Sequence, residues 1–152
     1  MEVEIRVEKG RTAPKVIIVT GEETEEIRAL TARLKELRLA PVPVRRGEER
    51  LLLPQERFLT FYTDGKGVSA RTEEGVYSLS LRLYELEEQL DRSRFVRISN
   101  GEIINLDKVT AVDLSLAGTI RMTLEGGVYA YVSRRYVKKI KETLREGRGR
   151  KK

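Results

Sequence analysis

From Leu51 onward the chain is a series of short segments in which apolar and polar residues alternate, separated by turns that contain glycine. Glycine between alternating apolar residues is a strong hairpin signal, because the favoured hairpin turns need positive φ. The turns fall at Asp64-Gly65, Glu74-Gly75, Ala117-Gly118 and Gly126-Gly127, and the predicted strands are RFLTFYT, GVSART, VYSLS, VTAVDL, TIRMTL and VYAYV. Strands at this spacing predict a mostly β (α+β) fold of small packed sheets.

Two helices interrupt or follow these strands. The first is a short helix with Ser80 as its expected N-cap, and its buried stripe is Leu83, Leu86 and Leu90. The second begins after Ser133, the expected N-cap of a run that reads as an amphipathic helix. Its inward face is Val137, Ile140 and Leu144, which leaves Arg134, Arg135, Lys138, Lys141 and Arg145 facing water or a ligand.

The first 45 residues predict a small β-β-α unit that precedes the β-rich part. Residues 2–8 alternate, which is typical of a half-buried strand, and residues 16–19 form a continuous apolar run typical of a more central strand. A helix follows whose apolar stripe is Ile27, Leu30, Leu34 and Leu37. This stripe either packs on the two strands before it, which is the simpler interpretation, or forms the seam of a dimer.

A boundary between the two parts is expected near residues 41–50. Pro41, Pro43 and the polar run RRGEER break the pattern on both sides. Residues 1–63 contain no Asp to accept a phosphoryl group, and they are too few for a response-regulator receiver domain. We therefore expect no receiver domain in front of the β-rich part.

The positive charge of the chain is concentrated at its end. The chain has a formal net charge of +6, yet residues 134–152 alone carry ten basic and two acidic side chains. The remaining 133 residues are slightly negative, with 20 basic and 22 acidic side chains. A basic helix on a nearly neutral body is the electrostatic signature of a surface that meets a polyanion, which points to nucleic acid.

Composition argues against several other classes of function. The sequence has neither Cys nor His, so it offers no thiolate or imidazole to a metal and no usual general base. It has no apolar run of membrane-spanning length and its start is acidic, unlike a secretory signal. We expect a cytoplasmic protein that is not inserted in a membrane, holds no metal or cofactor, takes no small-molecule substrate and is not an enzyme.

Residues 81–141 resemble the LytTR family of bacterial DNA-binding domains. The likeness lies in LRLYELEEQL, then FVRISNGEIINLDKV, a hairpin, and VSRRYVKKIK, and it extends to about residues 51–146. It implies about ten strands in small sheets, with loop side chains that enter successive grooves on one face of a bent duplex. Members typically bind paired direct or imperfect repeats, so the resemblance implies a sequence-specific transcriptional regulator that binds as a homodimer or as a cooperative pair on DNA. Residues 147–152 are expected to be a basic disordered tail.

The resemblance also assigns base-reading side chains. Asn100, in the loop Ser99-Asn100-Gly101, stands at a position where some members use asparagine, and an amide can pair with adenine in the major groove. Arg135, in Ser133-Arg134-Arg135, matches the arginine that enters a groove, where a guanidinium reads guanine for about 1–3 kcal/mol of discrimination.

The other candidates carry less defined roles. Lys138 is expected to face phosphate, and Lys66 in the hairpin DGKG is either a base contact or a phosphate contact. Arg97 is either paired internally or bound to phosphate, whereas Asn105 is expected to cap a turn or satisfy a buried backbone group. The candidate DNA-binding residues are Lys66, Arg97, Ser99, Asn100, Ser133, Arg134, Arg135 and Lys138.

Two alternatives to duplex DNA remain. A basic, RNA-binding or ribosome-associated β domain would carry exposed aromatic residues on a sheet for base stacking. The six tyrosines instead look mostly like core and edge packing. In the other alternative, the basic helix docks an acidic protein partner.

Overall fold

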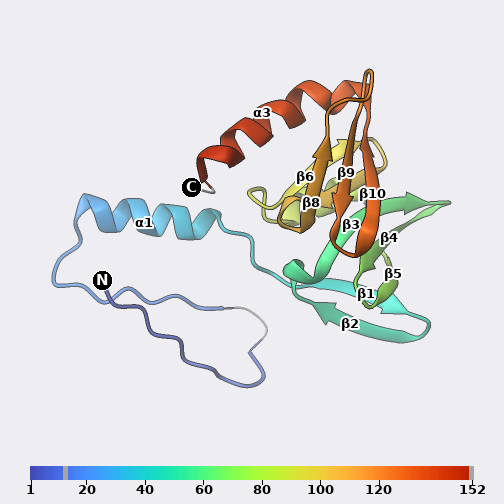
Figure 1. Cartoon of the computed structure of the whole chain (residues 1–152). Helices are drawn as coiled ribbons and strands as arrows, with labels where there is room; N and C mark the ends of the chain where they lie inside the picture. The colour runs from blue at the N-terminus through green and yellow to red at the C-terminus, as the bar shows by residue number, and fades with distance from the viewer. Residues whose placement is uncertain (12–13, 151–152) are drawn as a thin grey trace.

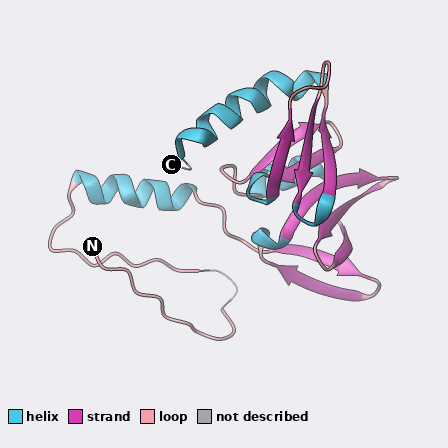
Figure 2. Cartoon of the chain, in the orientation of Figure 1, coloured by secondary structure: helices cyan, strands magenta, loops and turns pink. Residues whose placement is uncertain are grey.

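The computed structural model describes residues 1–11 and 14–150 and is mostly β (Figures 1 and 2). The α-helices are α1 (Glu25–Glu36), α2 (Leu83–Gln89) and α3 (Arg134–Arg150), and the 3-10 turns are η1 (Gln55–Arg57), η2 (Leu106–Lys108) and η3 (Glu125–Gly127). The strands are β1 (Val42–Arg46), β2 (Glu49–Leu53), β3 (Phe58–Asp64), β4 (Gly67–Thr72), β5 (Gly75–Leu79), β6 (Phe95–Ser99), β7 (Glu102–Asn105), β8 (Val109–Asp113), β9 (Ile120–Leu124) and β10 (Val128–Val132).

Within the described residues, the strands form two antiparallel sheets. One sheet has seven strands in the order β2-β1-β5-β4-β3-β7-β6, and the other has three in the order β10-β9-β8. The six strands predicted from hairpin signals are present as β3, β4, β5, β8, β9 and β10, so the predicted mostly β fold is confirmed. Figure 1 shows the three-stranded sheet standing against one side of the larger sheet.

The boundary predicted at residues 41–50 is wrong, because this stretch is the hairpin β1–β2 of the larger sheet. Pro43 pairs with Leu52 of β2, while β1 meets β5 only at Arg45. Pro43 therefore lies where no ladder bond to β5 needs its missing N–H. Gly47 closes the hairpin with a φ of +61°, and Val42 and Val44 are buried in the core.

The strands β3, β6 and β7 are buried on both faces. On one face, Phe61 and Ile103 pack with α2, whose predicted stripe Leu83, Leu86 and Leu90 is fully buried. On the other face are Leu59, Ile98, Ile104, Ile120, Met122, Leu124, Ala130, Val132 and Ile140, which belong to the larger sheet, the smaller sheet and α3. The molecule thus has two cores that share these strands: the first core lies on the side of α2, and the second core lies on the side of the smaller sheet and α3.

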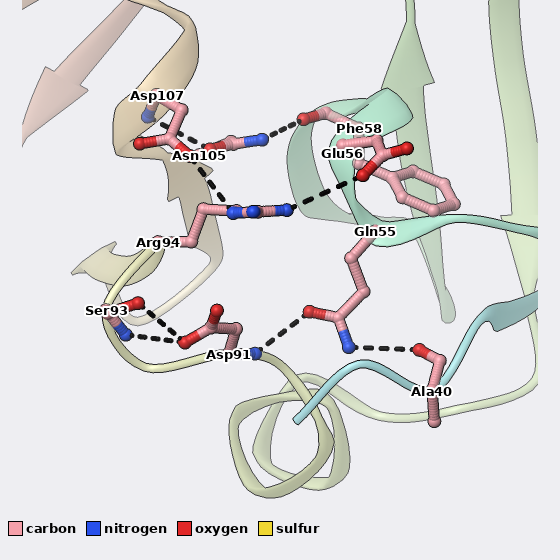
Figure 3. A network of polar contacts seen from close by, with 9 residues as sticks. All are labelled: Ala40, Gln55, Glu56, Phe58, Asp91, Ser93, Arg94, Asn105 and Asp107. Carbon is pink, nitrogen blue, oxygen red and sulfur yellow. Dashed lines mark hydrogen bonds and ion pairs between the residues drawn. The ribbon is translucent and has the colours of Figure 1, made fainter. Parts of the chain in front are cut away.

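A buried polar network joins the segments that lead into β1, β3 and β6 and the end of β7 (Figure 3). The Gln55 amide donates to the Ala40 carbonyl at 3.0 Å and accepts from the Asp91 N–H at 2.9 Å. The fully buried Asn105 donates from Nδ2 to the Phe58 carbonyl at 2.9 Å and accepts at Oδ1 from the Asp107 N–H at 3.0 Å. Asn105 caps η2 and satisfies a buried carbonyl, as its structural interpretation predicted.

The two strands predicted in residues 2–8 and 16–19 are absent from the structure, so the β-β-α unit is reduced to α1. Val3, Ile5 and Val7 are 80–86% exposed, and α1 has no fully buried residue. A two-stranded hairpin is marginal in water without a packed face. These segments have no such face, because the chain before α1 runs apart from the β-rich body (Figure 1).

The disordered tail predicted for residues 147–152 is also wrong in part. The backbone of α3 stays helical to Arg150, and residues 151–152 lie outside the described residues. Extending a formed helix adds one hydrogen bond per residue without a new nucleation step. The glycines at 147 and 149 therefore weaken the helix without ending it.

The interpretation of the tyrosines as core and edge packing needs correction. Tyr77 is buried, and Tyr62 and Tyr136 are half-buried. Tyr129 and Tyr131, however, are 56% and 55% exposed on the outer face of β10, where the Arg121 guanidinium lies 5.0 Å from the centre of the Tyr129 ring. A strand places alternate residues on the same face. The inward side chains of β10 are therefore those of Ala130 and Val132, which are buried.

Replacing Asn105 with Ala should lower the free energy of unfolding by about 2–4 kcal/mol, because two buried backbone groups lose their partners. The Asn100→Ala variant is the matched control, since Asn100 is exposed and its loss should cost at most about 1 kcal/mol. Urea denaturation measures both. Equal losses in the two variants would contradict the role of Asn105 in the network.

Candidate nucleic-acid interface

Asn100 lies in the turn between β6 and β7. A bulge between Arg97 and Ser99 shifts the register of this hairpin, and the Ser99 hydroxyl accepts from the Gly101 N–H at 3.2 Å. A Cβ on Gly101 would lie 2.8 Å from the Thr63 hydroxyl oxygen. A side chain at position 101 would therefore displace the Thr63 side chain of β3, whereas the φ of Gly101 is not positive.

The hairpin β3–β4, which carries Lys66, sits beside this turn. The Thr63 N–H donates to the Gly101 carbonyl at 2.9 Å. Lys66 is exposed in the two-residue connection that follows Asp64, and Gly65 next to it has a φ of +61°. The β6–β7 turn is thus bound to the end of β3 that leads to Lys66.

The beginning of α3 approaches the same turn from its other side. The Ser133 N–H donates to the Ile98 carbonyl of β6 at 2.9 Å. The Tyr136 hydroxyl in the first turn of α3 donates to the Asn100 Oδ1 at 3.1 Å. We refer to residues 64–67, 99–102 and 133–138 as the loop cluster.

These contacts bring the predicted base-reading residues to one region. Asn100 contacts the helical turn that contains Arg135, so the two do not lie on opposite sides of the molecule. Arg134 points differently: a Cβ on Gly118 would lie 3.2 Å from the Arg134 Nε, so this side chain packs against the β8–β9 loop.

The first turn of α3 has an unusual charge for a helix start. Its residues include Arg134 and Arg135 and no acidic residue, whereas the first turn of α1 carries Glu25 and Glu26. Cations at the positive end of a helix dipole are unfavourable by a few tenths of a kcal/mol to about 1 kcal/mol. Among the described residues, Arg135 has neither a hydrogen-bond nor an ion-pair partner. This start of a helix is therefore suited to an anion.

Further basic side chains extend this surface along α3. Lys138, Lys139 and Lys141 are exposed, and no described residue pairs with any of them. A row of unpaired cations next to a helix start attracts a phosphate backbone and makes that attraction sensitive to salt.

Two roles were predicted for Arg97, internal pairing and phosphate binding, and the structure shows internal pairing. Its Nη1 pairs with the Glu87 carboxylate of α2, and its Nε donates to the Ser99 carbonyl at 3.0 Å. Its Nη2 donates to the Asn100 carbonyl. The side chain is only 18% exposed, and all three guanidinium nitrogens have partners.

Glu102 is the carboxylate that follows the turn directly. Burial raises the pKa of this side chain above its ordinary value of 4.5, while a hydrogen bond from the Thr60 hydroxyl and the charge of Arg71 oppose the shift. The Thr60 hydroxyl lies 2.6 Å from the carboxylate. Glu102 is therefore partly buried against β3, where it accepts from Thr60.

Sequence reasoning missed Tyr136 and Thr63 as members of this site. Tyr136 lies 36 residues from Asn100, and Thr63 lies 38 residues from Gly101. Helical periodicity gives Tyr136 no special place, and Thr63 reads as an ordinary strand residue. Gly101 is the one local signal of the contact with Thr63. A glycine that is not explained by positive φ often marks a site that another segment approaches closely.

The described residues hold no group of three or more carboxylate, imidazole or thiolate side chains placed to bind a metal ion. None of the helices in the described part of the chain is long and apolar enough to span a bilayer.

Comparison with known proteins bears on the whole region. Residues 48–145 match the LytTr DNA-binding domain. Over 86 residues, which are 57% of this chain and 58% of the relatives' length, the chain is 46% identical to uncharacterized HTH-type transcriptional regulators of Staphylococcus aureus strains NCTC 8325 and COL. The chain therefore matches less than two thirds of each relative.

A solved structure has the same fold. It is the LytTr DNA-binding domain of a Bacillus cereus protein described as a methyl-accepting/DNA response regulator, with a TM-score of 0.66 and 19% identity. The superposition covers 68% of this chain and 95% of that domain. The family resemblance read from the sequence is confirmed.

Proposed function

The chain belongs to the LytTr DNA-binding domain family, and on that premise we propose that it is a transcriptional regulator that binds specific duplex DNA through the loop cluster. The observation that carries the proposal is the hydrogen bond between Tyr136 and Asn100, since it brings the β6–β7 turn and the start of α3 together. Two loops that meet in this way can present side chains to the same duplex.

The side chains divide into base-reading and phosphate-binding groups. In the proposal, Asn100 pairs with adenine and Arg135 with guanine in successive major grooves. Lys138 and Lys66 contact phosphate. The Ser99 hydroxyl shapes the β6–β7 turn by accepting from the Gly101 N–H, and the Ser133 N–H ties the start of α3 to β6. Arg134, which lies against Gly118, adds positive charge near the backbone of the duplex.

The arrangement of helices favours loops over a recognition helix. A helix-turn-helix motif needs two helices joined by a turn of three or four residues. Among the described residues, each α-helix is separated from the next by several strands. The name of the relatives, HTH-type transcriptional regulator, therefore supports a regulatory role here but not a helix-turn-helix motif. Binding through loops fits this chain better. The proposal needs no chemical step, so the protein acts by binding and not as an enzyme.

A second candidate is binding to RNA, and one observation favours it. Tyr129 and Tyr131 lie exposed on the same face of β10, which is the kind of aromatic surface on which unpaired bases stack. Arg121 beside Tyr129 adds a cation to that face.

We further propose that α1 pairs with the same helix of a second copy of the chain. The stripe Ile27, Leu30 and Leu34 is only half-buried, and Leu37 is 44% exposed. Charges along α1 are complementary in the antiparallel direction: residues 22–26 carry four acidic side chains and no basic one, and residues 33–38 carry three basic side chains and one acidic one, Glu36. These residues are Glu22, Glu23, Glu25 and Glu26 against Arg33, Lys35 and Arg38. A two-fold pair places each acidic start beside the partner's basic end.

Arg135→Ala should weaken binding to the cognate site by about 1–3 kcal/mol more than binding to random duplex, because it removes a base contact. Lys138→Ala should weaken both equally and reduce the salt dependence by about one released counterion. Cognate fragments come from genomic DNA selected by the purified protein, and fluorescence anisotropy at several salt concentrations measures affinity. Arg50→Ala, on the opposite edge strand β2, is the control for loss of one charge. Equal losses on cognate and random DNA would remove Arg135 from base reading.

Competition between duplex DNA and structured RNA separates the two candidates. For a duplex-binding protein, cognate duplex should displace a labelled duplex at concentrations at which RNA does not, and Tyr131→Ala should leave duplex affinity unchanged. Preferential displacement by RNA, with a loss of affinity in Tyr131→Ala, would favour the stacking surface instead. Gel-shift titration reads both results.

Leu34→Glu should convert a dimer into a monomer, because it places a charge in the apolar stripe. Ala32→Glu is the matched control, since it adds the same charge on the opposite face of α1, where the residue is exposed. Sedimentation equilibrium measures the oligomeric state. A wild-type protein that is monomeric at all accessible concentrations, or equal dissociation in the two variants, would contradict pairing through α1.

A further inference from the structure

Two side chains from outside the β6–β7 turn, Arg97 and Tyr136, hydrogen-bond to it at Ser99 and Asn100. Arg97 binds two successive carbonyls of the turn, those of Ser99 and Asn100, from beneath. Its third nitrogen is anchored to Glu87 of α2. Because α2 packs into the first core, this chain of contacts connects the turn backbone to the rigid body of the domain.

The Asn100 side chain is held separately, by α3. Its Oδ1 accepts from the Tyr136 hydroxyl at 3.1 Å, and the Tyr136 side chain packs against the second core. The hydroxyl is therefore presented from a fixed position. The backbone and the amide of Asn100 are thus each set by a different core.

We propose that Arg97 and Tyr136 are positioning residues that fix the orientation of the Asn100 amide and so determine which base this residue selects. The inference rests on the proposed function, in which Asn100 reads a base in the major groove. Neither Arg97 nor Tyr136 touches the base in this scheme, and both act through Asn100.

The chemistry of the amide explains why its orientation matters. Adenine offers an acceptor at N7 and a donor at N6, so an asparagine must present Nδ2 to the first and Oδ1 to the second. A free amide can rotate by 180° and exchange its donor and acceptor. The Tyr136 hydroxyl donates to Oδ1, which retains a second lone pair for adenine, and leaves both hydrogens of Nδ2 available. A phenol oxygen is a weaker acceptor than an amide oxygen, so the opposite orientation is disfavoured.

Arg97 is better suited to this role than to phosphate binding. To reach a phosphate it would have to leave Glu87 and two carbonyls, and its side chain is mostly buried. Lysine cannot replace it, because one ammonium does not reproduce the fork of an arginine.

Tyr136→Phe removes the hydroxyl and keeps the ring. Its preference for the cognate base over the other three at the Asn100 position should fall by about fivefold, which corresponds to a net hydrogen bond of about 1 kcal/mol. Affinity for random duplex and preference at the Arg135 position should not change. Tyr84→Phe, which alters an exposed tyrosine on α2, is the matched control. Binding to a panel of duplexes with each single-base change measures these preferences.

Coupling to Asn100 distinguishes positioning from general stabilisation. In an Asn100→Ala background, Tyr136→Phe should have no further effect on base preference, because the amide it orients is absent. Thermal unfolding of each variant shows whether the fold is retained. An unchanged base preference in Tyr136→Phe, or an equal loss in the Asn100→Ala background, would overturn the inference.

Arg97→Lys tests the backbone half of the proposal. It should reduce preference at the Asn100 position while leaving the salt dependence of binding unchanged, since one charge is kept and no phosphate contact is lost. Glu87→Gln, which removes the negative charge paired with Nη1 and leaves the charge of Arg97 in place, should produce a smaller loss of the same preference. The Arg97→Ala variant removes the charge as well. If it lowers affinity equally for all duplexes and reduces the slope of affinity against salt by about one, Arg97 contacts phosphate instead.

These outcomes remain separate from failure of the proposed function. If the wild-type protein shows no preference for any duplex, the proposed function fails and the inference falls with it. If the wild type has a cognate site and Asn100→Ala changes its base preference but neither Tyr136→Phe nor Arg97→Lys does, only the inference fails.

Discussion

The burial of β3, β6 and β7 on both faces is the constraint on which the rest of the molecule depends. Strands of this kind need one layer of cover on each side, which α2 supplies on one face and the smaller sheet with α3 supplies on the other. Adjacent residues such as Ile103 and Ile104 consequently point into different cores. The end of β6, which turns into β7, lies close to the point where β10 leads into α3, because the Ser133 N–H donates to the Ile98 carbonyl.

The loop cluster follows from this packing. Its contacts are polar: Thr63 meets Gly101 within the larger sheet, and Asn100 meets Tyr136, which packs against the core on the side of the smaller sheet. The price in local stability is visible at α3, whose first turn carries two arginines where a helix would favour acidic residues. Departures of this kind from local preference are expected where a surface serves a ligand.

The N-terminal part shows what happens to local sequence signals when no apolar face is buried. The alternation of Val3, Ile5 and Val7 is genuine, and α1 is properly capped by the Thr24 hydroxyl, which accepts from the Ile27 N–H. Local signals of this kind select a conformation only when an apolar face can be buried. In the β-rich body, the same alternation forms strands because their apolar faces are buried in the two cores.

The sequence by itself determined most strands of the body and the apolar stripe of α2, since alternation and glycine turns are local properties. It also determined the basic character of α3 and the family. Pro43 led to a wrong prediction of a domain boundary in place of the hairpin β1–β2. Only the strand pairing shows that the missing N–H of this proline is not needed for a bond to β5. The tertiary structure alone decided that Arg97 turns inward to Glu87 and that Tyr136 meets Asn100. Such contacts join residues distant along the chain, and only the packing of two cores brings them within reach.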